Sequence, residues 1–127
     1  MSHRALVVED DPDVRDLVVL SLEMSGLEVT TAETGATAVE RVRELDPDVV
    51  TLDLTLPDAD GREVCRRIRE FSDTRILLVT GRAETEDRRS GLEAGADDFM
   101  TKPFTPQELR TRVSELLERP RRVDGAG

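Results

Sequence analysis

The sequence is poor in residues from which many common functional sites are built. Its 127 residues include one cysteine, Cys65, one histidine, His3, and neither Trp nor Tyr. A single cysteine excludes an internal disulfide and a cysteine-based metal site. A single histidine makes a transition-metal site or a Ser-His-Asp triad hard to build. We therefore expect Cys65 to be a small core residue and His3 to be a solvated residue near the N-terminus.

Long apolar runs and glycine-rich phosphate loops are missing as well. No run of apolar residues is long enough to cross a bilayer, and no charged-then-apolar signal peptide stands at the start. We therefore expect a cytoplasmic protein with no membrane contact. Neither a GxxxxGKS/T motif nor a GxGxxG motif occurs, so nucleotide binding has no support in the sequence.

Positive charge is scarce. The chain has 28 Asp and Glu residues against 18 Lys and Arg residues, which gives a net charge of −10. An acidic domain repels polyphosphate backbones, so direct binding of nucleic acid is not expected. Lys102 is the single lysine. It can be a chance occurrence, or it can mark a place that needs a compact ammonium rather than a planar guanidinium.

What the chain does contain is an alternation of short apolar runs with amphipathic segments. Strands are expected at residues 4–8, 27–32, 48–53, 75–80 and 99–101, with helices between and after them. This alternation predicts an α/β fold, a parallel five-stranded sheet with helices on both faces. Residues 1–119 are expected to form one domain and residues 120–127 a disordered tail or linker.

Several helix boundaries carry capping signals. Asp11 followed by Pro12 is a good start for a first helix, in which apolar residues recur up to Met24. Residues 105–108, with the sequence TPQE, form a capping box that opens the last helix. The helix after Gly61 has one apolar face, and its other face is expected to be an ordinary solvated surface that carries Arg62, Glu63, Arg66, Arg67 and Arg69.

Polar residues end four of the expected strands. Glu9 and Asp10 follow the first, Asp53 ends the third, Thr80 ends the fourth and Lys102 follows the fifth. Because the carboxyl ends of parallel strands share one edge, these side chains should gather there. Three clustered carboxylates repel one another, and a hard cation such as Mg²⁺ relieves that repulsion.

A carboxylate beside Mg²⁺, an ammonium and a hydroxyl is well arranged for phosphoryl transfer, with Asp53 as the nucleophile. Gly81 has no side chain to block access to the phosphoryl group. Each residue alone also has an ordinary explanation: helix capping for Asp10, a turn for Asp53, and a strand end or surface position for Thr80 and Lys102. Their joint placement at four strand ends favours a functional site.

Four stretches resemble the receiver domain of two-component response regulators. They are VVEDDP at 7–12, LDLTLPDADG at 52–61, LVTG at 78–81 and GADDFMTKPF at 95–104. The resemblance covers residues 4 to about 119 and implies a flavodoxin-like (βα)5 sandwich with strand order 2-1-3-4-5. It also implies a phosphoacceptor switch that takes its phosphoryl group from a sensor histidine kinase. Such a domain is not an enzyme beyond self-catalysed phosphotransfer and autodephosphorylation.

By position, the resemblance assigns a role to each residue of the site. Asp53 would be the phosphoacceptor. Mg²⁺ would be held by Asp53, by Asp10 directly, by Glu9 through water and by the backbone carbonyl of Thr55.

The resemblance also assigns phosphoryl-binding and switch residues. Thr80, Gly81 and Lys102 would contact the phosphoryl group. Thr80 and Phe99 would form the switch pair, in which the hydroxyl moves toward the phosphoryl group and the ring turns inward. Phe99 replaces the more frequent Tyr, and Arg82 is one of two positions in the family that flank the route of the hydrolytic water.

The segment from Arg88 to Arg112 is similar to the subclass whose output is a winged-helix DNA-binding domain. In that subclass the fourth helix, fifth strand and fifth helix form a symmetric dimer with ion pairs between subunits. The candidate residues can equally form a solvated charged face. They are Arg88, Asp97, Asp98, Glu108 and Arg112.

Two alternatives to the signalling switch are kept. One is an aspartate-nucleophile phosphohydrolase, which is disfavoured because such enzymes usually carry a second Asp where this chain has Thr55. The other is a phosphorylation-independent interaction module, which is disfavoured because all five key side chains are present.

Overall fold

Strands and helices alternate along the whole chain. The computed structural model describes residues 3–81 and 85–121. Its ten elements are β1 (Arg4–Val8), α1 (Pro12–Met24), β2 (Glu28–Ala32), α2 (Gly35–Leu45), β3 (Val49–Asp53), α3 (Gly61–Arg69), β4 (Arg75–Thr80), α4 (Thr85–Glu93), β5 (Asp98–Thr101) and α5 (Pro106–Glu118).

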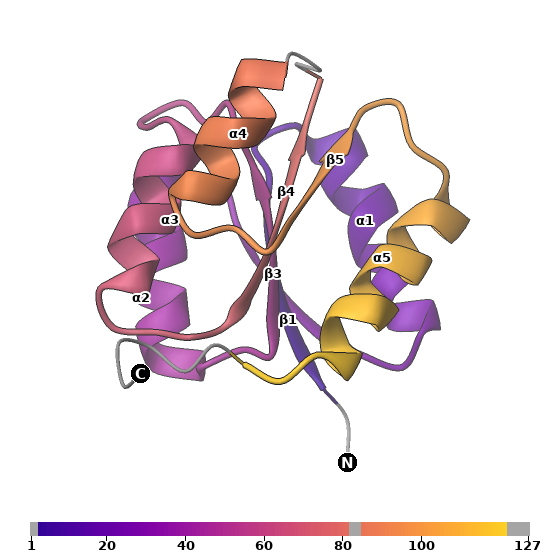
Figure 1. Ribbon diagram of the computed structural model, residues 1–127. Coiled ribbons are helices and arrows are strands. Elements are labelled where there is room, and N and C mark those ends of the chain that lie inside the picture. Colours follow the sequence, from indigo (N-terminus) through magenta and orange to yellow (C-terminus); the bar gives the residue numbers. More distant parts are fainter. Residues whose placement is uncertain (1–2, 82–84, 122–127) are drawn as a thin grey trace.

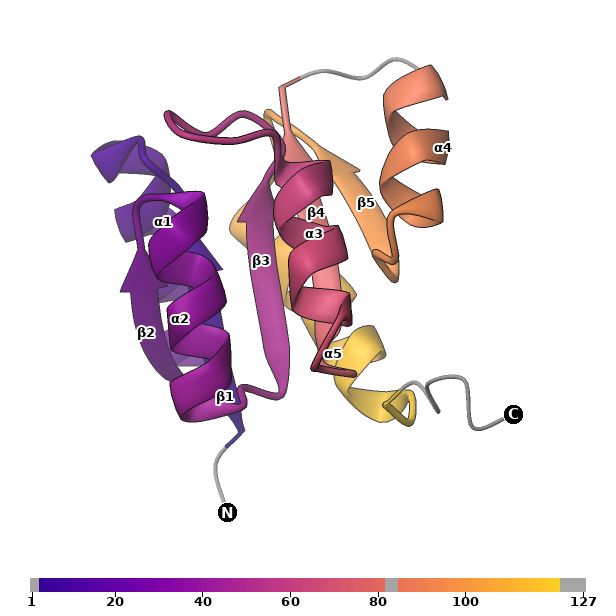
Figure 2. The same ribbon diagram turned by 90° about the vertical axis from the view of Figure 1, so that its left-hand side faces the viewer.

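The five strands form one parallel sheet in the order β2-β1-β3-β4-β5, which confirms the predicted order. Helices α2, α3 and α4 cover one face of the sheet, and α1 and α5 cover the other, as Figures 1 and 2 show from two directions. The central strand β3 is buried along its whole length, which explains why its sequence is a run of apolar and β-branched residues.

The sheet separates two apolar cores. Alternate strand residues point to opposite faces, so Leu6, Val50 and Leu78 pack under α2, α3 and α4, whereas Val7 and Leu77 pack under α1 and α5. Cys65 is fully buried in the first core, which confirms the prediction for that residue. His3 is exposed, also as predicted.

Strand register brings the predicted site residues to one edge. Val8 pairs with Leu52. Glu9, which directly follows β1, and Asp53, the last residue of β3, therefore lie side by side. Thr80, at the end of β4, pairs with Thr101, which directly precedes Lys102. The carboxyl ends of the strands therefore meet as the parallel topology requires.

Helix α1 differs from its sequence pattern on one side. Asp11 caps it as predicted, since its side chain accepts hydrogen bonds from two backbone N–H groups of the first turn. However, three of its apolar residues, Leu17, Leu20 and Met24, are 39%, 57% and 70% exposed. The helix contacts β1, β2 and α5 along a narrow face, so the recurring apolar residues do not all reach the core.

Helix α3 also corrects the sequence analysis. Arg62 and Arg69 were expected on a solvated face, but their side chains are 22% and 14% exposed. Arg69 donates to the carbonyl oxygens of Gly95, Ser72 and Thr74 and pairs with Asp97 at 2.9 Å. These hydrogen bonds satisfy the guanidinium inside the fold, so only part of that face is ordinary surface.

The boundaries of the last two helices were predicted unequally well. The sequence predicts a polar loop over residues 81–87, but α4 already begins at Thr85. Helix α5 begins as predicted, with the complete capping box between Thr105 and Glu108. The longest helices, α1 and α5, have 13 residues each. In residues 3–81 and 85–121, no helix combines the length and apolar character that a membrane span requires.

After α5, the chain contacts the segments that precede β3 and β4. Arg121 pairs with Asp46 at 2.7 Å and with Asp73 at 3.0 Å. Arg75 donates to the carbonyl oxygen of Arg119. The second residue of the predicted tail at 120–127, Arg121, is therefore bound to the domain, and the last six residues, 122–127, lie outside the described part of the chain.

Candidate phosphoryl and metal site

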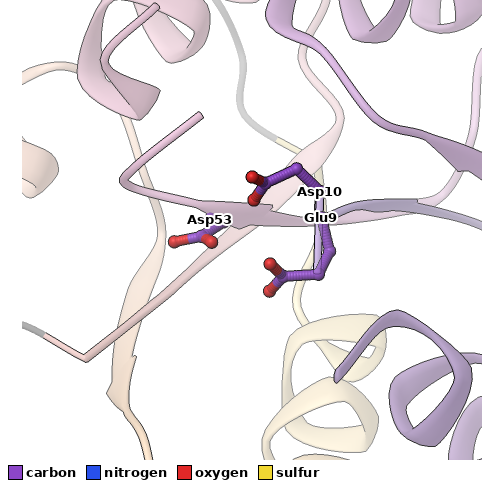
Figure 3. A group of neighbouring side chains, drawn as sticks. All are labelled: Glu9, Asp10 and Asp53. Atoms are coloured by element: carbon purple, nitrogen blue, oxygen red, sulfur yellow. The ribbon is translucent and has the colours of Figure 1, made fainter. Parts of the chain in front are cut away.

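Three carboxylates meet at the carboxyl ends of β1 and β3. Ligand atoms of Glu9, Asp10 and Asp53 all lie within 4.8 Å of one another. Figure 3 shows the three carboxylate groups gathered around the ends of the two strands. Glu9 and Asp53 are 4% and 6% exposed, whereas Asp10 is exposed. Two buried carboxylates at this distance need a compensating positive charge.

The loop between β3 and α3 folds tightly against Asp53. The backbone N–H of Thr55 donates to Asp53 Oδ1 at 3.1 Å, and Thr55 forms an isolated bridge with Asp60. The N–H of Gly61 donates to the carbonyl oxygen of Leu54 at 2.6 Å. A Cβ at Gly61 would lie 2.5 Å from the carbonyl oxygen of Asp53, so this approach requires glycine.

Lys102 supplies a positive charge to the cluster. Its Nζ lies 2.9 Å from Glu9 Oε1 and 3.3 Å from Asp53 Oδ2. The backbone N–H of Lys102 donates to the carbonyl oxygen of Thr80 at 2.7 Å, and the following peptide bond to Pro103 is cis. These contacts hold the ammonium at the edge where Asp53 ends its strand.

Burial and charge shift the pKa values of this cluster. Burial of the Glu9 carboxyl outweighs the hydrogen bond from Lys102 and, together with the neighbouring Asp53, raises the pKa of Glu9 from 4.5 to about 7. Burial alone lowers the pKa of Lys102, but its hydrogen bond to Glu9 and the charges of Asp53 and Glu9 raise it above its ordinary value. Lys102 therefore stays charged, and Glu9 is poised to lose a proton when a further cation binds.

The donor set fits a hard divalent cation. The cluster consists of carboxylate oxygens, two of them buried and one facing solvent, and oxygen ligands with room for retained water suit Mg²⁺. Burial is the main cause of the raised pKa of Glu9, and the neighbouring Asp53 adds to it. Thr55, two residues after Asp53, is exposed, and its role as a backbone-carbonyl ligand stays a prediction.

The predicted switch residues lie on neighbouring strands. Thr80 is 1% exposed at the end of β4, and Gly81 after it is exposed, with no atom within 4 Å of where a Cβ would stand. The Phe99 ring is buried in the core under α4, and the Arg88 guanidinium carbon lies 5.7 Å from its centre. The movement of Thr80 and Phe99 stays a prediction, because a single conformation is described.

The candidate dimer residues have contacts within the chain. Asp97 pairs with Arg69, and its Oδ2 also accepts from the N–H of Ile76 at 2.8 Å. Asp98 pairs with Arg112 at 3.1 Å.

Two further candidates of that face also have internal roles. Arg88 lies over the Phe99 ring, and Glu108 closes the capping box of α5. Of the whole set, the exposed residues Arg88 and Glu108 and the partly exposed Asp98 and Arg112 remain accessible. The dimer stays a prediction.

Two residues at the site loop have contacts that the sequence analysis did not predict. Asp58 accepts from the backbone N–H groups of Gly35 and Ala36 at 2.7 and 3.1 Å, so it caps α2 from the loop that follows Asp53. Arg62 joins the same loop to α4. Neither contact has a local signal, because each joins segments far apart in the chain. Arg82, which the resemblance places near the hydrolytic water, lies outside the described residues.

Comparison with protein families gives one match over most of the chain. The model described as "Response regulator receiver domain" matches residues 5–114. Among curated proteins, the chain is similar to the DNA-binding response regulator MtrA of Mycolicibacterium smegmatis, with 43% identity over 119 residues, 94% of this chain and 52% of that protein. It is also similar to the alkaline phosphatase synthesis transcriptional regulatory protein PhoP of Bacillus subtilis, with 42% identity over 94% of this chain and 50% of that protein. The chain spans about half the length of these curated relatives.

Solved structures of response regulator receiver domains are similar to this chain over most of its length. The beryllofluoride-activated receiver domain of DrrB has a TM-score of 0.87 and 39% identity, covering 94% of this chain and 100% of that one. A response regulator from Chloroflexus aurantiacus has a TM-score of 0.89 and 36% identity, with the same coverage. Together with the observed strand order, these similarities confirm the predicted flavodoxin-like fold.

Proposed function

Because the chain belongs to the family of response regulator receiver domains, the phosphoacceptor switches of two-component signalling, we propose that its phosphoacceptor is Asp53. The arrangement of Glu9, Asp10, Asp53 and Lys102 at one sheet edge carries this proposal. Asp53 is the member of the cluster that ends the central strand β3 and that contacts the ammonium directly.

The proposed reaction is transfer of a phosphoryl group from a phosphohistidine. A carboxylate oxygen of Asp53 attacks phosphorus, the phosphorus–nitrogen bond breaks, and the histidine keeps its electron pair. The product is an acyl phosphate on Asp53. We propose that Lys102 Nζ neutralises one phosphoryl oxygen and that the Thr80 hydroxyl moves to donate a hydrogen bond to another. Gly81 leaves access to the phosphoryl group open.

A bound Mg²⁺ would neutralise negative charge on the phosphoryl group during transfer. We propose that Asp10, Asp53 and the Thr55 backbone carbonyl hold it directly and that Glu9 acts through water. Glu9 also forms an ion pair with the Lys102 ammonium. It can therefore orient that side chain and contribute charge to the cation at the same time.

We propose a sensor histidine kinase as the phosphoryl donor, because receiver domains of this family are partners of such kinases. The relatives MtrA, a DNA-binding response regulator, and PhoP, a transcriptional regulatory protein, are about twice this length. An output domain that controls transcription is therefore the proposed target of the switch. A dimer through α4, β5 and α5 is a further proposal. With a net charge of −10, this chain is not expected to bind nucleic acid itself.

Domains of this family are signalling switches rather than enzymes. For this chain, we propose self-catalysed phosphotransfer and autodephosphorylation as its full chemistry. Thr55 stands where a phosphohydrolase would need its acid/base carboxylate, which counts against turnover of small phosphoesters.

The test uses acetyl phosphate with Mg²⁺ and mass spectrometry of the intact chain. We expect one phosphoryl group to be added to the wild type and none to Asp53→Asn. Asp16→Asn, an exposed position on α1, is the matched control and should behave as the wild type. Undiminished phosphorylation of Asp53→Asn would overturn the assignment. Rapid turnover of a phosphomonoester that depends on Asp53 would favour the phosphohydrolase instead.

A further inference from the structure

The part of helix α4 whose burial is described, from Arg88 to Glu93, makes few apolar contacts with the rest of the domain. Gly91 is the buried residue of this part. Gly91 packs closely on Leu78, where an added Cβ would lie 2.5 Å from Leu78 Cδ1. With so little apolar surface to fix it, the position of α4 depends strongly on the polar contacts that it makes.

One of these contacts comes from Arg62 on α3. Arg62 Nη1 donates to Ser90 Oγ at 2.7 Å. The same guanidinium donates two hydrogen bonds to Asp60, from Nε to Oδ1 at 2.8 Å and from Nη2 to Oδ2 at 2.6 Å. A planar guanidinium bound in this two-point manner has a fixed orientation. The direction in which Nη1 points toward α4 is therefore set by the position of Asp60.

Asp60 in turn belongs to the loop that carries the proposed metal ligand. Thr55 and Asp60 form the isolated bridge of that loop, and the Thr55 N–H donates to Asp53. A short series of contacts therefore leads from Asp53 through Thr55, Asp60 and Arg62 to Ser90 on α4. Each step is a hydrogen bond, an ion pair or a backbone bridge between part-buried groups.

We propose that Arg62 is a positioning residue that couples the occupancy of the Asp53 site to the position of α4. This inference rests on the proposed function, because it concerns how that site reaches the rest of the domain. Binding at the site draws on the Thr55 carbonyl and the Asp53 carboxylate, and so shifts the loop. Asp60 moves with the loop, and the Arg62 guanidinium turns with Asp60. The hydrogen bond from Arg62 to Ser90 then shifts or breaks, and the position of α4 changes.

Two variants break the coupling without touching the site. Arg62→Lys keeps the positive charge but cannot bind Asp60 at two points and Ser90 at the same time. Ser90→Ala removes the acceptor on α4, and Ser90→Thr restores a hydroxyl as a rescue. Arg66→Lys is the matched control, since Arg66 lies on the same helix and pairs with Glu63 on the surface.

The measurement is amide hydrogen exchange of the peptide that covers α4, in the full chain, with and without Mg²⁺ and beryllofluoride. In the ligand-free chain, we expect Arg62→Lys and Ser90→Ala to exchange about tenfold faster, since each loses a hydrogen bond to a charged group. Ser90→Thr and Arg66→Lys should match the wild type. The double variant should be no faster than either single variant, because both remove the same contact.

The ligand arm separates coupling from mere stabilisation of α4. Beryllofluoride should change the exchange of α4 in the wild type, and this change should be largely lost in Arg62→Lys and Ser90→Ala. Because coupling is reciprocal and neither residue contacts the site, the affinity for beryllofluoride should change by no more than the factor by which occupancy changes the exchange of α4. An unchanged response in both variants would overturn the coupling. If the wild type does not bind beryllofluoride, the proposed function fails and the coupling falls with it, while the ligand-free arm still decides whether Arg62 holds α4.

Discussion

The ammonium of Lys102 lies 2.9 Å from Glu9 and 3.3 Å from Asp53. Lys102 directly follows the edge strand β5. Its side chain therefore connects this edge of the sheet to the ends of the neighbouring strands β1 and β3. A cation that binds these carboxylates must share them with Lys102.

The first prediction concerns Lys102→Ala. Removing the ammonium leaves two buried carboxylates without their cation, so we expect the free energy of unfolding to fall by about 1–3 kcal/mol in the absence of divalent cations. Mg²⁺ should reduce this loss, because it supplies positive charge at the same carboxylates. Urea unfolding at about pH 8, where Glu9 is ionised, with and without Mg²⁺, checks both statements.

The same variant should bind Mg²⁺ several-fold more tightly than the wild type, since a nearby positive charge no longer repels the cation. Lys102→Arg keeps that charge and should not show the increase. Weaker Mg²⁺ binding by Lys102→Ala would contradict the view that the ammonium and the metal share Glu9 and Asp53.

The second prediction concerns pH. The pKa of Glu9 is raised from 4.5 to about 7, so between these values the folded chain holds a proton that the unfolded chain has lost. Protonated Glu9 therefore adds stability below about pH 4.5, and this contribution is lost as the pH rises through 7. Mg²⁺ requires the ionised carboxylate, so its affinity should increase by up to about tenfold per pH unit below 7 and then level off.

Calorimetric titration of Mg²⁺ from about pH 5.5 to 8 measures this dependence. Glu9→Gln, which cannot ionise, should bind Mg²⁺ more weakly and with little dependence on pH in that range. An equally steep pH dependence in Glu9→Gln would assign the proton to another group.

The third prediction uses two glycines beside the site. A Cβ at Gly61 would lie 2.5 Å from the Asp53 carbonyl oxygen and 2.7 Å from Leu54 Cα, both backbone atoms. Gly61→Ala should therefore destabilise the chain by about 1–3 kcal/mol and displace the end of β3. Gly81→Ala meets no atom within 4 Å and should leave stability within about 0.5 kcal/mol of the wild type.

Thermal unfolding compares the two glycine variants directly. Equal losses of stability in both would show that glycine matters here for backbone freedom rather than for the close approach of α3 to Asp53.

The fourth prediction concerns Asp58, which caps α2 from the loop after Asp53. Asp58→Ala should cost about 1 kcal/mol, the usual loss for a helix cap, and Asp58→Asn should cost less because it retains an acceptor oxygen. Hydrogen bonds from Gly35 and Ala36 lower the pKa of Asp58. Its contribution is therefore present above pH 3.8 and lost as the pH falls below that value.

Urea unfolding at neutral and acidic pH checks the role of Asp58. The difference between wild type and Asp58→Ala should shrink on acidification. A difference that stays constant down to about pH 2 would assign it to something other than the carboxylate charge.

The features that the sequence predicts well are those that chain topology forces. Once five apolar runs alternate with helices, a parallel sheet follows, and Glu9, Asp53 and Lys102 must reach one edge because each stands at the end of its run. The helix starts at Asp11 and Thr105 were predictable because a cap acts within its own first turn.

The features that sequence analysis missed depend on contacts between distant segments. Arg69 reads as a surface residue, yet carbonyl groups from the α3–β4 and α4–β5 connections satisfy its guanidinium inside the fold. Leu20 and Met24 belong to the apolar residues that recur along α1, yet they are 57% and 70% exposed, because α1 contacts only β1, β2 and α5. Neither outcome is visible in a periodicity that records one helix at a time.

Lys102 and Glu9 stand 93 positions apart and meet only when all the central strands are aligned. No shorter fragment of the chain contains the complete set of oxygen donors next to this ammonium. A cation that binds the assembled cluster and not the unfolded chain raises the free energy of unfolding by mass action, by about 2.7 kcal/mol at a concentration 100 times its Kd. Free Mg²⁺ would thus stabilise the whole sheet against unfolding, and the melting temperature would increase with the fractional occupancy of the site.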